Sequence, residues 1–307
     1  MINHYHLNDP KNNSATTNNT KLNDPALYIP QPELIDAVNV SITLGLPLLL
    51  TGEPGTGKTD LANHLAWHFN LGDVIKLNIQ TSSKSTDLFY RYNALAHFHY
   101  NQNHPIALNP DEIENKFIRY QGLGAAIVAK NRKIVLLDEI DKASRDLPND
   151  VLGALEFLSF EVPEIDKTYS TDRENAPIII ITSNSEKNLP DPFLRRVTYF
   201  HIQFPMEEKL LSILSSKVTG YSAEQLPHLI KHFSAIREDN SLKLRKKPAT
   251  AELIQWAYFL YQANFDPSVL NKKSLTAEEL RILNCSYSIL AKVKEDLVAL
   301  KEWKLMK

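Results

Sequence analysis

Residues 52–59 read Gly-Glu-Pro-Gly-Thr-Gly-Lys-Thr, which is the pattern of a phosphate-binding loop. Glycines let successive backbone N–H groups face a phosphate, and a helix that begins here adds its positive end. We expect Lys58 to reach the β- and γ-phosphates and Thr59 to bind Mg²⁺. The candidate nucleotide-binding residues are Gly52, Glu53, Pro54, Gly55, Thr56, Gly57, Lys58 and Thr59. A chance glycine-rich turn is the alternative, but the flanking residues have the pattern of a strand and a helix.

An apolar run at 134–138 ends in two acids, Asp138 and Glu139. In open α/β sheets, ligands bind at the carboxyl ends of the strands. We expect Asp138 to hold Mg²⁺, directly or through water, and Glu139 to polarise the attacking water. An acidic strand end that faces solvent is the alternative. Asp141 lies nearby and is interpreted as a structural or metal-shell residue.

The most apolar strand candidate, 177–182, is followed by Ser183 and Asn184. A polar side chain at this edge could orient the water that attacks the phosphate. An asparagine that caps a loop explains the residue equally well. Both interpretations of Asn184 remain open on the residues alone.

The remaining pattern predicts two kinds of architecture in succession. Apolar strand candidates alternate with amphipathic helices, which is typical of a parallel sheet covered on both faces. The strand candidates are 47–51, 74–79, 134–138, 177–182 and 198–203, and the helix candidates between and before them are 31–44, 58–70 and 147–158. After Pro205 no comparable strand follows. Helices are expected there at 207–219, 223–236, 249–263 and 276–303.

These patterns predict a disordered tail at 1–24, an α/β domain at 25–205 and a smaller helical domain at 206–307. The formal net charge of the 307 residues is −2, which gives no overall attraction to nucleic acid or to an anionic membrane. The one cysteine, Cys285, excludes an internal disulfide and is expected to be a buried apolar thiol. The sequence shows no apolar segment typical of a secretory signal or a membrane span, so we expect a cytoplasmic protein.

The order of three motifs resembles AAA+ ATPases of the MoxR-like group. These motifs are the phosphate loop, Leu-Leu-Asp-Glu-Ile-Asp-Lys-Ala from position 136, and Ile-Thr-Ser-Asn ending at position 184. Residues 87–95 are similar to a segment after the second strand in that group, and residues 119–126 to the segment before its Walker B strand. The resemblance implies a P-loop NTPase-type sheet followed by a helical lid. It also implies a helix-2 insert at about 94–118 and a hairpin before sensor 1 at about 160–176.

The resemblance assigns a role to each candidate. Residues 52–59 would be Walker A, Asp138 and Glu139 Walker B, and Asn184 sensor 1. An arginine finger that acts on the neighbouring subunit would be Arg196, with Arg195 second, although a surface arginine pair is the alternative. One departure concerns sensor 2, because no arginine follows Pro248. The positions that could supply its charge are Arg245, Lys246 and Lys247.

We therefore expect an ATPase that cleaves the β–γ phosphoanhydride with ATP and Mg²⁺. The resemblance implies a homo-oligomeric, hexameric ring that remodels a protein client, with a von Willebrand factor A domain protein as one class of partner. Two alternatives remain: a nucleic-acid motor of a restriction or defence system, and a slow nucleotide-controlled switch. The residues do not decide between adenine and guanine, and the resemblance favours adenine.

Overall fold

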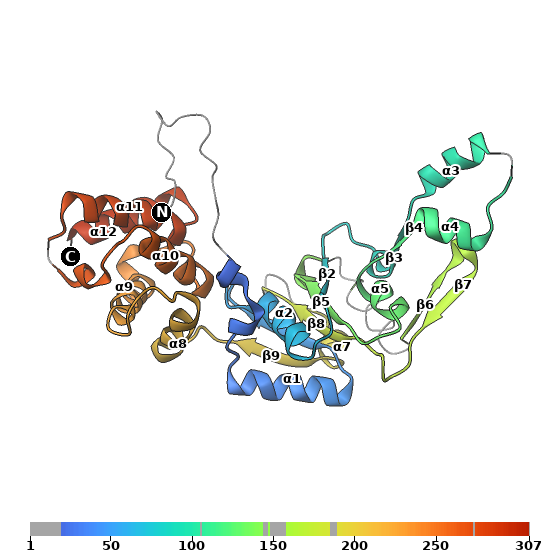
Figure 1. Cartoon of the computed structure of the whole chain (residues 1–307), viewed down its shortest axis with the longest axis horizontal. Helices are drawn as coiled ribbons and strands as arrows, with labels where there is room; N and C mark the ends of the chain where they lie inside the picture. Colours follow the sequence, from blue (N-terminus) through green and yellow to red (C-terminus); the bar gives the residue numbers. More distant parts are fainter. Residues whose placement is uncertain are drawn as a thin grey trace. The chain divides into compact units, whose positions relative to one another are not determined.

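The computed structural model describes residues 20–104, 106–143, 147, 158–184, 189–272 and 274–306 (Figure 1). The chain divides into two compact units. The sheet unit contains Pro30–Gly52 and Lys58–Ile202. The helical unit contains the residues before Pro30, Glu53–Gly57 and Gln203–Lys307. The middle of the phosphate loop thus groups with the helical residues, which the predicted boundaries at 24 and 205 do not anticipate.

The sheet unit is built on a parallel sheet in the order β2-β5-β8-β1-β9. Its strands are β1 (Leu48–Gly52), β2 (Ile75–Asn78), β5 (Ile134–Asp138), β8 (Ile178–Thr182) and β9 (Thr198–Ile202). Each of these strands lies within one residue of its predicted range, and the predicted P-loop NTPase-type fold is confirmed. In the register, Asn78 pairs with Asp138 and Leu50 with Thr182, so the carboxyl ends of four strands lie along one edge.

Helices cover both faces of this sheet (Figure 1). On one face, Leu49, Val135 and Ile181 pack with Leu123 of α5 (Gly122–Val128). The helices α2 (Lys58–His68) and α1 (Pro32–Leu44) also contact the sheet, and every residue of β1 and β8 is buried. Burial on both faces explains why these strands are continuous apolar runs. The helix predicted at 147–158 lies outside the described residues, except for its two end positions.

Two antiparallel hairpins extend the sheet unit. In the first, β3 (Tyr90–Tyr92) pairs with β4 (Ile118–Tyr120), and the short η3 (Ser85–Leu88) precedes β3. The chain between these two strands forms the helices α3 (Ala94–Asn103) and α4 (Pro110–Phe117). The second joins β6 (Ser159–Val162) to β7 (Lys167–Ser170) through η5 (Pro163–Ile165). These hairpins lie where the helix-2 insert and the hairpin before sensor 1 are expected.

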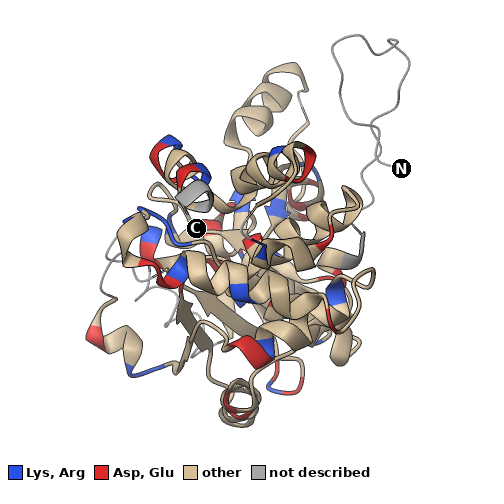
Figure 2. Ribbon diagram, turned by 90° about the vertical axis from the view of Figure 1, so that its left-hand side faces the viewer, with Lys and Arg blue, Asp and Glu red and all other residues tan. Residues whose placement is uncertain are grey.

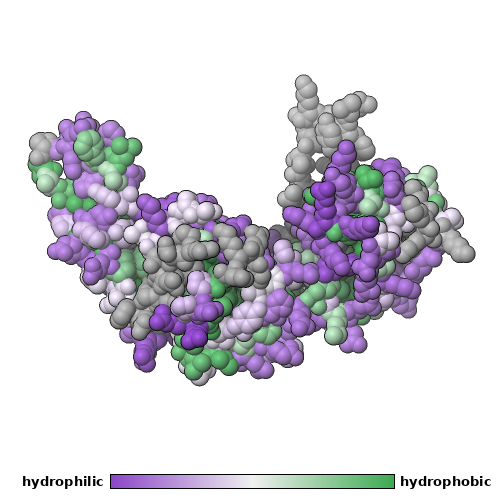
Figure 3. All heavy atoms as spheres, turned by 180° about the vertical axis from the view of Figure 1, so that it is seen from behind, coloured by the Kyte–Doolittle hydropathy of each residue, from purple (hydrophilic) through white to green (hydrophobic). Residues whose placement is uncertain are grey.

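A carboxylate on α4 connects the two hairpins. Glu114 lies 2.7 Å from the Lys167 ammonium and accepts hydrogen bonds from the hydroxyls of Tyr120 and Tyr169. Burial raises the pKa of Glu114, but these hydrogen bonds outweigh it and hold the pKa below its usual value. At the nearby α3, apolar side chains gather on the surface instead (Figure 3). Leu95 and Phe98 of α3 are exposed, and so is Ile106, which lies after the helix.

The helical unit has its own core. Trp256, Tyr287 and Phe233 are fully buried at its centre, and the Tyr287 hydroxyl lies 3.0 Å from Nε2 of His232. Acidic and basic residues are interspersed along the helices around this core (Figure 2). The elements of the unit are η1 (Thr20–Asn23), η2 (Pro25–Leu27), α8 (Glu207–Lys217), α9 (Leu226–Glu238), η6 (Asn240–Leu242), α10 (Thr250–Gln262), η7 (Pro267–Asn271), α11 (Ala277–Leu290) and α12 (Lys294–Met306).

Two predictions for this unit are wrong. The single helix expected at 276–303 is two helices, and the chain turns between Leu290 and Lys294 although no glycine or proline lies there. Burial decides the turn, because it brings Leu300 of α12 into the core. Cys285 is exposed rather than buried, since the core face of α11 follows Leu283, Tyr287 and Leu290, and position 285 lies off that face.

Among the described helices, none combines the length and the apolar character that crossing a bilayer requires.

We expect Leu300→Ala to lower the free energy of unfolding by about 2–5 kcal/mol, because it leaves a cavity where α12 packs into the core. Chemical denaturation followed by tryptophan fluorescence measures the change. Lys301→Ala is the matched control, since Lys301 is exposed on the same helix. Equal stability of the two variants would show that α12 does not contribute to this core.

Candidate functional site

The carboxyl ends of β5 and β8 are joined by the hydroxyl of Thr182. This hydroxyl donates to Oδ1 of Asp138 at 2.6 Å and accepts a hydrogen bond from the backbone N–H of Glu139 at 3.0 Å. Thr182 is 1% exposed, so the contact is shielded from water. The sequence suggests no role for Thr182 beyond its place at a strand end. In the structure it fixes both Walker B candidates relative to β8.

Asp138 has a different partner at each oxygen. The hydroxyl of Thr59, the second residue of α2, lies 3.4 Å from Oδ1, and the Lys76 ammonium lies 2.7 Å from Oδ2. Burial raises the pKa of Asp138, but the hydrogen bonds from Lys76 and Thr182 outweigh burial and hold the pKa below its usual value. Asp138 is therefore ionised at neutral pH. A carboxylate and a hydroxyl this close together are a donor pair of the kind that Mg²⁺ binds.

Glu139 adopts an unusual backbone conformation. Its φ of 62° and ψ of 51° are left-handed, a conformation that side chains other than Asn, Asp and Gly rarely adopt. Its carboxylate lies 2.6 Å from the Lys142 ammonium and accepts a hydrogen bond from the Asn184 amide at 3.3 Å. Oδ1 of Asp141 accepts from the backbone N–H of Asn184 at 3.3 Å. The structure thus brings the predicted base and the predicted sensor 1 residue into contact.

The phosphate loop needs its glycines. Gly52, Gly55 and Gly57 have φ values of 141°, 78° and 88°, which residues with a side chain rarely adopt. The loop is also held by its own side chains. The Thr56 hydroxyl donates to the carbonyl of Glu53 at 2.8 Å, and the Lys58 ammonium donates to the carbonyl of Gly52 at 2.8 Å. Helix α2 begins at Lys58, as the pattern predicts.

The predicted arginine finger lies on exposed chain. Arg195 and Arg196 follow α7 (Asp191–Leu194), and both side chains are exposed. Together with Asp191 and Pro192 they line an open depression in the surface. No described residue forms an ion pair with either guanidinium. Both are thus accessible to a second molecule.

Of the basic cluster considered for sensor 2, Arg245 pairs with a residue of the last helix. The Arg245 guanidinium lies 3.8 Å from Glu295 of α12, and the backbone N–H groups of Arg245 and Lys246 donate to Asp296. Another arginine of the helical unit, Arg237, contacts the phosphate loop, and its guanidinium lies 3.0 Å from Glu53. The sequence gives no signal for this pair, because 184 positions separate the two residues.

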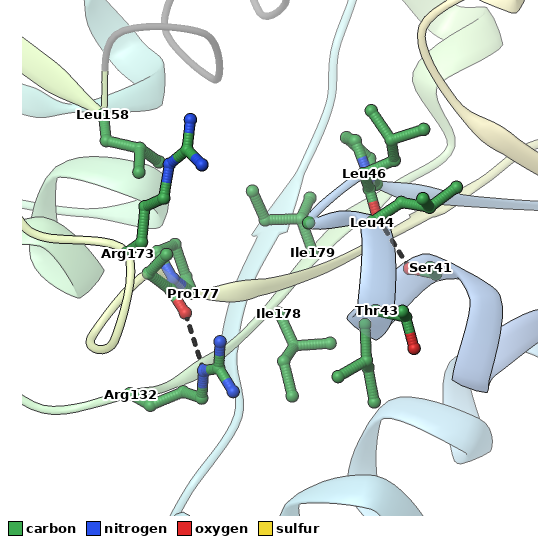
Figure 4. Close-up of a pocket in the computed structure, with 14 residues that line it drawn as sticks. Ser41, Thr43, Leu44, Leu46, Arg132, Leu158, Arg173, Pro177, Ile178 and Ile179 are labelled. Atoms are coloured by element: carbon green, nitrogen blue, oxygen red, sulfur yellow. Dashed lines mark hydrogen bonds between the residues drawn. The ribbon is translucent and has the colours of Figure 1, made fainter.

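The sheet unit also contains a cavity of about 490 Å³ that none of the predicted site residues lines (Figure 4). It lies where β1 and β8 begin, at the amino ends of the strands, whereas Asp138 and Asn184 follow carboxyl ends. Arg132, Arg173 and Leu44 are among its lining residues, and Nε of Arg132 donates to the carbonyl of Ala176 at 3.0 Å.

Within the described residues, no cluster of three or more His, Cys, Asp or Glu side chains is arranged to hold a metal.

The comparisons with known proteins identify one domain. Residues 47–197 match the family model described as the AAA domain, dynein-related subfamily. The match contains the phosphate loop, the Walker B candidates and Asn184, so residues 47–197 have the sequence pattern of an AAA domain. A comparison with curated proteins finds no significant match.

Solved structures resemble the chain at low sequence identity. A proposed ATPase from Cytophaga hutchinsonii has 16% identity and a TM-score of 0.45, with 94% of this chain and 93% of that chain covered. A mutant of RuvB from Thermotoga maritima has 13% identity and a TM-score of 0.48 over 85% of this chain and 71% of that chain. The RuvB Holliday junction branch migration motor from the same organism has 13% identity and a TM-score of 0.45, with 85% and 70% covered. These likenesses are too distant to support a function.

We expect Lys76→Met to lower the free energy of unfolding by about 1 kcal/mol or less at pH 7, because the ion pair with Asp138 is lost and Lys76 is partly exposed. The folded-state pKa of Asp138 is depressed, so its stabilisation is present above the unfolded pKa, about 3.9, and is lost as the pH falls through the folded value. Urea titrations at several pH values measure this, with the exposed Lys84→Met as control. A difference between Lys76→Met and wild type that persists undiminished at pH 2 would contradict the assignment.

Proposed function

We propose that this chain is an AAA+ protein that binds ATP with Mg²⁺ and hydrolyses its β–γ phosphoanhydride bond. The observation that carries the proposal is the convergence of Thr59, Asp138, Glu139 and Asn184 at the carboxyl edge of one parallel sheet. This edge is where ligands bind in such sheets. The fixed phosphate loop precedes α2 at the same edge, since β1 ends at Gly52.

In this proposal the phosphate loop binds the nucleotide. Its backbone N–H groups and the N-terminal end of α2 would face the phosphates, and Lys58 would exchange the carbonyl of Gly52 for phosphate oxygens. Thr59 and Asp138 would hold Mg²⁺, as their separation of 3.4 Å suits a shared cation. The ion, when bound, supplies positive charge that neutralises the phosphates. Lys76 would keep the carboxylate of Asp138 ionised and oriented.

Glu139 would polarise the attacking water and accept its proton, and Asn184 would orient that water from the neighbouring strand. The Lys142 ammonium, 2.6 Å from Glu139, competes with water for the carboxylate. Efficient turnover thus requires Glu139 to exchange this ion pair for a hydrogen bond to water.

The same ion pair supports a second candidate function, a slow nucleotide-controlled switch. Single-turnover hydrolysis that is slow with saturating ATP would favour the switch over a motor.

The further proposal is a MoxR-like ring, hexameric and homo-oligomeric, in which each subunit supplies an arginine to the next one. The exposed Arg195 and Arg196 support it, since both are accessible to a second copy of the chain.

The exposed apolar side chains of α3, Leu95 and Phe98, support a protein client, for which a von Willebrand factor A domain protein remains one class. The formal net charge of −2 does not favour a nucleic-acid client.

We expect Glu139→Gln to lower kcat for ATP by about 10²–10⁴-fold, because the amide cannot accept the proton of the attacking water. Binding of ATP should persist, since the phosphate loop is unchanged. Phosphate release and binding of a fluorescent ATP analogue measure the two effects. Glu161→Gln, on the exposed side of β6, is the control. Wild-type turnover by Glu139→Gln would exclude Glu139 as the base.

We expect Arg196→Ala to lower kcat by about 10³–10⁵-fold if its guanidinium stabilises the transition state. A finger that acts on the neighbour predicts complementation. Mixing Arg196→Ala subunits, which keep the base, with Glu139→Gln subunits, which keep the finger, should restore part of the activity. Arg195→Ala, tested in the same way, decides between the two arginines. A mixture as inactive as its components would count against an arginine supplied by a neighbouring subunit.

A further inference from the structure

An acidic residue lies inside the loop that is proposed to bind a polyanion. Glu53 is the first residue after Gly52, and its side chain is 52% exposed. A carboxylate near the phosphates of ATP opposes binding by like-charge repulsion. The guanidinium of Arg237 places a positive charge beside Glu53, with Nη2 at 3.0 Å from Oε2.

Arg237 is held firmly in this position. Its side chain is 10% exposed and lies 3.6 Å above the centre of the Phe204 ring. Its Nη1 donates to the carbonyl of Pro248, just before α10 begins. Arginine suits such a site, because its planar group can stack on a ring and donate in two directions at once. Glu53 is the partner that belongs to the phosphate loop.

The same loop meets the first turn of α10 through its backbone. The N–H of Ala251 donates to the carbonyl of Gly55 at 3.2 Å. A Cβ atom on Gly55 would lie 3.0 Å from Cβ of Ala249 and 3.4 Å from Cβ of Ala251, so the approach allows only small residues. The ion pair of Glu53 and the contact of Gly55 both lie within the helical unit. Together they fix the first half of the phosphate loop.

We propose that Arg237 is a positioning residue of the nucleotide site, which acts by neutralising Glu53 within the phosphate loop. The inference rests on the proposed function, because it concerns the same loop. Arg237 acts through Glu53 and needs no contact with the phosphates. It lies near the end of α9, whereas the resemblance places the sensor 2 arginine at the start of a lid helix, where this chain has Ala249 and Ala251.

The test is a charge-rescue comparison of nucleotide binding. Arg237→Met removes the guanidinium charge beside the Glu53 carboxylate, so Kd for a fluorescent ATP analogue should rise about two- to fivefold, the range for a partly exposed ion pair. The rise should be smaller for the ADP analogue, which carries less charge. Adding Glu53→Gln to Arg237→Met removes the repulsion and should return Kd to near the wild-type value. A role in packing alone gives no such rescue, because the second substitution does not restore the contact with Phe204.

Arg281→Met is the matched control, since Arg281 forms an exposed ion pair with Glu278 within α11, and its Kd should equal that of wild type. Melting temperatures are recorded for every variant. If Arg237→Met folds poorly, Arg237→Lys with and without Glu53→Gln gives the comparison, and the lysine alone should bind ATP nearly as wild type does.

The possible results separate the two proposals. Wild-type protein that binds ATP, with a double variant no better than Arg237→Met, overturns the role of Arg237 and leaves the ATPase proposal standing. Wild-type protein that does not bind ATP overturns the proposed function and this inference with it. Rescue by Glu53→Gln, greater for ATP than for ADP, supports the inference.

Discussion

The hydrogen bond between Thr182 and Asp138 is the contact on which the candidate site depends. It joins the ends of two strands that are 44 positions apart in sequence, and the same hydroxyl receives the N–H of Glu139. A buried hydroxyl used as donor and acceptor at once leaves little freedom to either neighbour. The parallel register places Thr182 beside β5, and Thr182 in turn fixes where the two acids point. The chemistry of the edge therefore follows from the pairing of β5 with β8.

Much of this arrangement can be predicted from the sequence, for identifiable reasons. Strands buried on both faces must be apolar throughout, so β1, β5 and β8 stand out as runs such as Ile178–Ile181. The phosphate loop stands out because few residue types tolerate the φ values at Gly55 and Gly57. Parallel strands align their carboxyl ends, so polar residues that follow them meet. The proximity of Asp138, Glu139 and Asn184 is predictable for that reason.

The contacts that the sequence does not reveal are those between distant segments. Nothing local distinguishes Arg237 from Arg245, yet one stacks on Phe204 beside the phosphate loop and the other points to Glu295. Lys76 has the pattern of an ordinary strand residue, and only the register shows that it reaches Asp138. The turn before α12 likewise has no local signal, since burial of Leu300 outweighs helix propensity. In each case tertiary packing chooses among locally equivalent residues.

The left-handed backbone of Glu139 sets the stability of the fold against the need for a carboxylate at this position. Such a conformation costs about 1–3 kcal/mol for a residue with a long side chain, and the surrounding hydrogen bonds must overcome that cost. A chain selected for stability alone would carry glycine or asparagine at this position. Glutamate at this position lowers the free energy of unfolding, and the stability of the packed sheet compensates for that loss.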